Sequence, residues 1–159
     1  MAAKVTPPPR WVTRHGVTVV VMAAGAVVAV VGSLLPWLRT GNRRRHSYDV
    51  FALADRLGFA DGGLTEQGLR WWPFVPLLTA VAVVAAWWGW RRAGSVIGIG
   101  AGLYAGGIGW SVAAAPERGL DIESGPVVTA VGGVLLLVGS LATLAVSTRG
   151  RTSPTAPAR

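Results

Sequence analysis

The side chains of this sequence that could act as catalytic acids and bases are its carboxylates, and all seven lie between residues 49 and 123. Two carboxylates on either side of a substrate can serve as general acid and general base. The candidates stand in polar segments between apolar ones: Asp55, Asp61, Asp121 and Glu123. Because their spacing singles out no pair, we expect solvated loop acids, and a membrane enzyme ranks third among three functional hypotheses.

Metal and cofactor motifs are absent from the sequence. The chain has no cysteine, which excludes thiol catalysis and thiolate metal sites. His15 and His46 do not have the spacing of a metal-binding pair. Gly100, Gly102 and Ala105 match a relaxed dinucleotide-binding pattern, but no strand precedes them and their surroundings are apolar, so we expect packing glycines. We therefore predict no enzymatic activity, no cofactor and no metal.

The secondary-structure elements that would position these side chains can be predicted from the stretches of sequence that lack charged residues. Only 14% of the 159 residues are charged, against about 25% in a typical soluble domain. Four stretches contain no charged residue and no histidine, and each has the roughly 20 residues that a helix needs to cross a bilayer. These stretches are residues 17–38, 71–90, 94–115 and 126–147.

The four stretches predict an all-α, polytopic membrane protein, with an antiparallel bundle of four transmembrane helices within residues 16–147. A basic tail (1–15) precedes the bundle and a disordered tail (148–159) follows it. A cleaved signal peptide is the alternative for the first stretch, but its apolar core would have only about 7 to 15 residues. The greater length of the first stretch favours a retained helix.

Tryptophans stand near the ends of the predicted spans, where an indole ring can lie between hydrocarbon and water. Trp71 and Trp88 are about 26 Å apart along a helix, close to one hydrocarbon thickness. We predict that seven tryptophans are interfacial anchors and that few of the rings fill the core. The seven are Trp37, Trp71, Trp72, Trp87, Trp88, Trp90 and Trp110.

The third span carries a row of small residues, and helices in lipid associate where small residues let their backbones approach. Glycine recurs at every fourth position in Gly94, Gly98, Gly102 and Gly106. This row predicts that the third span lies at the centre of the bundle. The row could serve an oligomer or partner interface, but packing within the chain is favoured because neighbouring helices compete for the same face.

The orientation in the membrane follows from the connections between the spans. Eight basic residues fall on the side of the tails and seven on the other side, so the positive-inside rule decides little. All seven acids lie on the side opposite the tails, and the short Arg91-Arg92 turn is hard to translocate. We predict a plasma-membrane protein with both termini cytoplasmic, although Arg43, Arg44 and Arg45 just beyond the first span speak against this orientation.

The connection over residues 39–70 predicts a short extracytoplasmic helix that begins at Ser47 and stops at Gly58. The helix could lie on the membrane surface, but a lid over the bundle, held by ion pairs of Arg56 or Arg70, is favoured. Arginine side chains match phosphate oxygens, so a possible lipid headgroup contact is formed by the three neighbouring arginines Arg43, Arg44 and Arg45. The alternative is that these arginines are a solvated flank.

The spans contain no ionisable side chain, and ion or proton carriers need such groups to relay charge. The charge pattern also gives no support to nucleic-acid binding. The lipid bilayer and other membrane subunits, or further copies of this chain, are the expected partners. We expect a non-catalytic accessory or scaffold subunit of a larger envelope or transport complex, with a homo-oligomeric pore or a lipid or small-molecule carrier as the alternative.

The chain has fourteen arginines and one lysine, spans rich in alanine, valine and glycine, the exit sequence Leu35-Pro36-Trp37-Leu38-Arg39 and the turn Trp90-Arg91-Arg92. In these features it resembles the small, mostly uncharacterised four-span membrane proteins of high-GC actinobacteria. The resemblance covers the architecture and implies a four-span fold. It implies no site residues.

Overall fold

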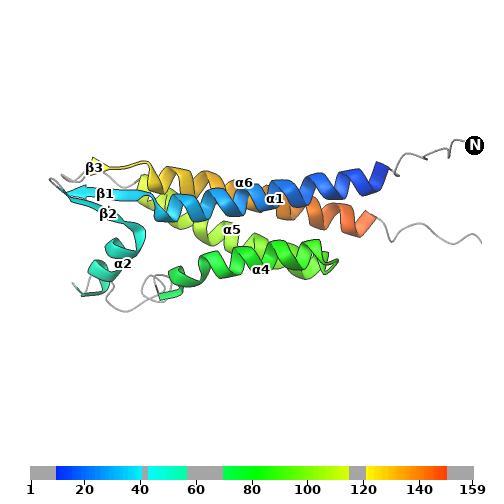
Figure 1. Cartoon of the computed structure of the whole chain (residues 1–159), viewed down its shortest axis with the longest axis horizontal. Helices are drawn as coiled ribbons and strands as arrows, with labels where there is room; N and C mark the ends of the chain where they lie inside the picture. The colour runs from blue at the N-terminus through cyan, green and yellow to red at the C-terminus, as the bar shows by residue number, and fades with distance from the viewer. Residues whose placement is uncertain (1–9, 41–42, 57–69, 115–120, 150–159) are drawn as a thin grey trace, which may run out of the picture.

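The computed structural model describes residues 10–40, 43–56, 70–114 and 121–149. Its elements follow the chain in one order (Figure 1). They are α1 (Arg10–Leu34), β1 (Pro36–Thr40), β2 (Arg43–His46), α2 (Ser47–Arg56), the 3-10 turn η1 (Trp72–Phe74), α4 (Val75–Trp87), α5 (Arg91–Ala113), β3 (Asp121–Ile122) and α6 (Gly125–Arg149).

The described part of the chain is mostly helical, and three of its helices are long and apolar enough to cross a membrane. These three segments are Gly16–Leu34, Arg91–Ala113 and Gly125–Thr148. The second predicted span corresponds to a shorter apolar helix over Trp72–Trp87, about 24 Å long at helical rise. Length and composition therefore identify three candidate spans.

The ends of these helices have local causes. α1 ends at Leu34, earlier than the predicted Leu38, because Leu35 precedes Pro36 and a residue before proline disfavours the helical conformation. α4 ends at Trp87, and Gly89 follows with a φ of 96°, a left-handed conformation that suits glycine.

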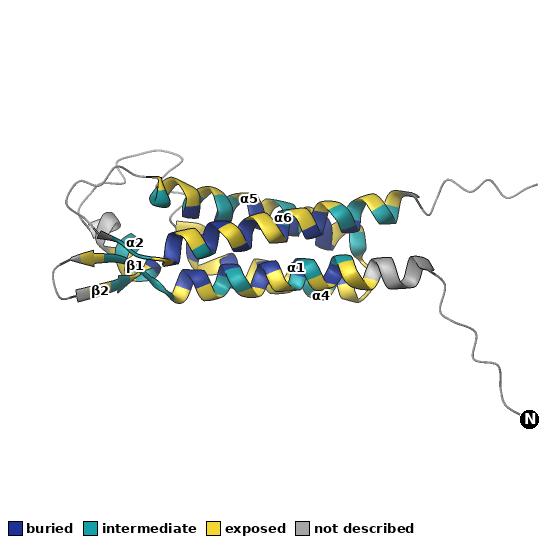
Figure 2. Ribbon diagram, turned by 90° about the horizontal axis from the view of Figure 1, so that it is seen from above, coloured by how far each residue is buried: buried dark blue, intermediate teal, exposed yellow. Residues whose placement is uncertain are grey.

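The four long elements lie side by side, with α6 between α1 and α5 (Figures 1 and 2). α4 packs mainly on α5 and less on α1. The third span, which was predicted at the centre, corresponds to α5 and packs between α6 and α4, while α6 packs between α1 and α5. The reason is that α6 carries small residues on two faces, so both neighbours can approach it closely.

The close approach is visible at two glycines of α6. A Cβ on Gly133 would lie 2.5 Å from the backbone nitrogen of Gly106 in α5. A Cβ on Gly139 would lie 2.5 Å from the backbone nitrogen of Met22 in α1. Side chains are thus excluded from these contacts, and the helices touch through their backbones.

The buried residues of the described segments include no ionisable side chain. Buried hydroxyls of α6 donate instead to carbonyl oxygens of their own helix: Thr129 to Gly125 at 2.9 Å and Thr143 to Gly139 at 2.8 Å. Such bonds satisfy the hydroxyls without a polar partner on another helix.

A small sheet, which the sequence did not predict, joins the helical fold at one end of the molecule. β1 pairs in antiparallel fashion with both β2 and β3, which gives the order β2-β1-β3. In this register Leu38 lies between Arg45 and Ile122. We call this end, which also carries α2, the cap end, and the end with the α4–α5 turn the turn end.

α2 begins at Ser47, as predicted, while the predicted stop at Gly58 lies outside the described residues. Val50 and Phe51 of α2 pack against the buried Trp37 and Trp72. α2 therefore covers the end of the bundle, which agrees with a lid.

Gly133→Ala is expected to destabilise the protein by about 1–3 kcal/mol, because the added methyl group would force α5 and α6 apart. Gly107→Ala in α5 is the matched control, since a Cβ there would meet nothing within 4 Å. It should change the free energy of unfolding by less than about 1 kcal/mol. Unfolding in mixed detergent, followed by circular dichroism, measures both values, and equal losses would contradict the backbone contact.

Candidate functional site

The most elaborate side-chain arrangement in the described chain is an aromatic cluster at the cap end. It consists of Trp37 from β1, Phe51 from α2, Trp72 from η1 and Tyr104 from α5, and we call it the aromatic cap. The centroids of the Trp37, Phe51 and Trp72 rings are 5.1 to 5.5 Å apart and the rings meet edge to face. Tyr104 lies 6.0 Å from Trp72. Edge-to-face packing is a favourable geometry for aromatic rings.

Hydrogen bonds fix the polar atoms of the aromatic cap. The indole nitrogen of Trp37 donates to the carbonyl oxygen of Gly32 at 2.9 Å. The indole nitrogen of Trp72 donates to the Ser47 hydroxyl at 3.1 Å, and that hydroxyl donates to the carbonyl oxygen of Ser33 at 2.5 Å. One buried hydroxyl thus connects α1, α2 and η1.

The placement of Trp37 and Trp72 corrects their prediction as interfacial anchors. Their side chains are 0% and 1% exposed, so protein encloses both rings. Sequence position alone did not separate Trp72 from the neighbouring Trp71. The burial of Trp72 could have been predicted from helical periodicity. Residues 72, 75, 79, 82 and 86 share one helical face, and the last four are small or β-branched, which is typical of a packed face.

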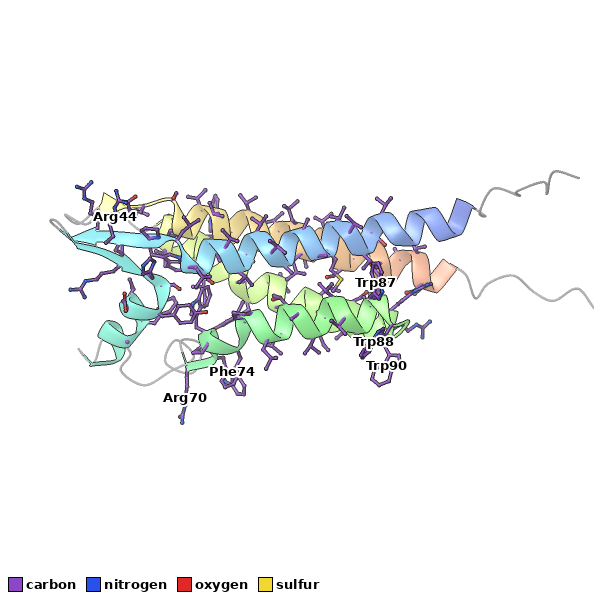
Figure 3. All side chains as sticks on the ribbon, in the orientation of Figure 1. Arg44, Arg70, Phe74, Trp87, Trp88 and Trp90 are labelled. Atoms are coloured by element: carbon purple, nitrogen blue, oxygen red, sulfur yellow. The ribbon has the colours of Figure 1, made fainter. Side chains whose placement is uncertain are left out.

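The other five predicted anchors have the opposite environment. They are 60% to 81% exposed and comprise Trp71, Trp87, Trp88, Trp90 and Trp110. Figure 3 shows Trp87, Trp88 and Trp90 together at the turn end, with Phe74 and Arg70 near the cap end. Trp71 packs beside Phe74, with ring centroids 5.4 Å apart. Exposed indoles therefore occur at both ends of α4, as an interfacial role requires.

The glycine row of the third span faces other helices of the same chain. Gly94 lies against Ala82 and Ala86 of α4, whereas Gly98 faces Ser140 of α6 and Met22 of α1. Gly102 and Gly106 face Gly133, also in α6. These contacts favour packing within the chain over an oligomer interface for this row.

The three neighbouring arginines form strand β2. Arg44 is exposed and lies opposite Arg39, which on its other side lies opposite Asp121. The side chain of Arg43 is outside the described ones. β1 continues roughly along the direction of α1 (Figure 1), so its five residues extend about 17 Å beyond the helix. One headgroup layer is about 5 to 8 Å thick, and the geometry therefore favours a solvated hairpin over the predicted headgroup contact.

The prediction held the lid by ion pairs of Arg56 or Arg70 with the acids of residues 117–123. Arg70 is exposed and points away from the bundle (Figure 3), and the side chain of Arg56 is outside the described ones. Among the described side chains, the aromatic cap and the Ser47 hydroxyl hold α2. Both interactions are buried, so their strength does not depend on salt.

The loop acids are placed by the structure only in part. Asp55 lies in α2, Asp121 in β3 and Glu123 just after β3, while Asp61 lies outside the described residues. The backbone nitrogen of Glu123 donates to the Trp37 carbonyl at 3.1 Å, which places this acid beside the sheet. Among the residues described, no group of three histidine, aspartate or glutamate side chains has a metal-binding arrangement.

Comparison of the chain with protein-family models, with curated proteins and with solved structures gave no match.

Ser47→Ala is expected to lower the free energy of unfolding by about 1–3 kcal/mol, because it leaves the buried Trp72 indole and Ser33 carbonyl without their partner. Trp72→Phe removes the indole donor but leaves the bond from the Ser47 hydroxyl to Ser33 in place. The double variant should lower the free energy of unfolding by less than the sum of the two single variants. The exposed Trp87→Phe is the control and should be near neutral. Additive losses in this double-mutant cycle would show that the two side chains do not interact.

Proposed function

We propose that this chain is an integral membrane protein with four membrane-crossing helices that acts as a non-catalytic accessory subunit of a larger membrane complex. The observation that carries the proposal is the contrast between its interior and its surface. The described interior combines backbone contacts, small apolar side chains and buried hydroxyls such as Thr129 and Thr143 that donate to their own helix. The outward faces of the helices carry valine, leucine and tryptophan side chains that are about half exposed or more. A protein of this kind acts through its surface.

The proposed fourth crossing is made by α4. Arg44 and Trp90 lie at opposite ends of the molecule (Figure 3), and α4 is the element that carries the chain from the cap end to the turn end between them. Its helix is shorter than the hydrocarbon core, but a bilayer can thin locally at a modest cost in free energy. The exposed Trp71 and Trp87 at its two ends support this placement.

The proposed orientation puts the turn end in the cytoplasm. α1 begins and α6 ends at the turn end (Figure 1). The basic turn of Arg91 and Arg92 belongs to the same end, whereas Asp49 and Glu123 lie at the cap end. Arginines in a short turn resist translocation, which supports a plasma-membrane protein with cytoplasmic termini.

The surface best suited to a protein partner is the outward face of α5. Gly100 and Gly107 lie there, and a Cβ on either would meet nothing within 4 Å. Leu103 lies between these two glycines, whereas the outward face of α1 carries Val20 and Val27 and opens a single glycine near its start. Small residues let a second helix approach closely, so we propose that the larger subunit packs against the outward face of α5. A second copy of the chain on the same face is the alternative and corresponds to the pore or carrier.

Single-cysteine labelling tests the topology, since the chain has no native cysteine. In intact cells His46→Cys and Ser124→Cys, both at exposed positions of the cap end, should react with an impermeant maleimide. Ala93→Cys and Thr148→Cys, exposed toward the turn end, should react only after lysis. Labelling of His46→Cys and Ala93→Cys from the same side would show that α4 does not cross.

Purification from native membranes in mild detergent tests the accessory role. The wild-type chain should elute with a larger membrane protein at a fixed stoichiometry, and Gly100→Leu with Gly107→Leu should reduce the bound fraction severalfold. Val20→Leu with Val134→Leu is the matched control, because these side chains are 60% and 56% exposed on other helices. A pure homo-oligomer that the glycine variant dissociates would instead establish the pore or carrier alternative.

A further inference from the structure

The turn between α4 and α5 has a fixed backbone geometry. The backbone nitrogens of Trp88 and Trp90 donate to the carbonyl oxygens of Val84 and Ala85, each at 2.9 Å. Gly89 between them has a φ of 96°, which closes the end of α4 in the manner of a Schellman turn. α5 begins at once at Arg91. The side chains of this turn are therefore held on a rigid support.

Three indole rings of the turn are among the most exposed large side chains of the molecule. Trp87, Trp88 and Trp90 are 71%, 81% and 75% exposed, and Figure 3 shows them gathered at one end of the bundle. Rings of this size on one short segment are unfavourable in water, but they are favourable at the level of lipid headgroups.

Two arginines follow the indoles directly. Arg92 is exposed and Arg91 is half-exposed. The described acids Asp49 and Glu123 lie at the cap end, so neither is available to pair with these guanidinium groups. A guanidinium group at this level matches the phosphate of a lipid through paired hydrogen bonds.

This turn carries more exposed indoles and arginines than any other short segment of the described chain. Arg70 precedes one exposed indole, Trp71, whereas Arg91 and Arg92 follow three. Arg44 and Arg45 stand on a strand that extends beyond the helices, and the ring nearest to them in the sheet, Trp37, is buried. At the turn, exposed indoles and guanidinium groups lie on the same short segment, so one lipid can meet both. A soluble anion would make no use of the indoles.

We propose that the segment from Trp87 to Arg92 is a binding site for anionic phospholipid, in which Arg91 and Arg92 hold the phosphate-bearing headgroup and the three indoles contact the region below it. The inference rests on the membrane insertion proposed above and is independent of the accessory role. It holds for whichever leaflet contains the turn.

Tryptophan quenching by brominated lipids tests the site in reconstituted full-length protein. Brominated phosphatidylcholine should quench the fluorescence and so report insertion. Brominated phosphatidylglycerol should bind about fivefold more tightly than phosphatidylcholine, the effect of one favourable arginine contact at a membrane surface. Arg91→Gln with Arg92→Gln should bring this ratio close to one, with unchanged helicity by circular dichroism.

Arg44→Gln with Arg45→Gln is the matched control, because it removes the same charge at the cap end and should leave the ratio unchanged. Inorganic phosphate should compete no better than chloride at the same ionic strength, which separates the lipid headgroup from free phosphate. The site is ruled out if the turn variant keeps the wild-type ratio, if the control lowers it equally, or if phosphate displaces the lipid. Absence of quenching by either lipid would instead contradict the membrane insertion itself.

Discussion

Direct backbone contact between α6 and its two neighbours is the constraint on which the rest of this structure depends. Gly133 meets α5 and Gly139 meets α1 at distances that leave no room for a side chain. Helices in lipid gain little from burying apolar side chains, because the surrounding hydrocarbon is equally apolar. Close packing of backbones is then the main source of association, and the position of α6 between α1 and α5 follows from it.

The aromatic cap solves a different physical problem at the end of the bundle. Here the chain leaves the helices, and polar backbone groups and indole nitrogens must be satisfied in a partly buried environment. The strands of the sheet satisfy the backbone, while Ser47 joins Trp72 to Ser33. The same contacts fix α2 over the bundle, so the lid and the helices form one packed unit.

The two ends of the molecule therefore differ in chemistry. The cap end is internally bonded and holds the described acids, whereas the turn end gathers three exposed indoles beside Arg91 and Arg92. Between them the outward faces are apolar. Among the long helices, α5 opens Gly100 and Gly107 to the outside, and α1 opens Gly16 near its start. The proposed accessory role and the proposed lipid site thus use separate surfaces of one rigid body.

The sequence by itself determined the apolar helices, because lipid excludes charged side chains and an uncharged stretch can be recognised from neighbouring residues alone. It also placed the start of α2 at Ser47 and the glycine row on one face of α5. The end of α1 could also be predicted from the sequence, since the residue before Pro36 disfavours the helical conformation.

Only the tertiary structure decided that a sheet forms, because β3 has two residues and pairs with a strand far away in the chain. The tertiary structure also decided that Trp37 and Trp72 are buried while Trp71 and Trp87 are exposed. An indole at a helix end can lie in lipid or in protein, and the neighbours that enclose it come from distant segments.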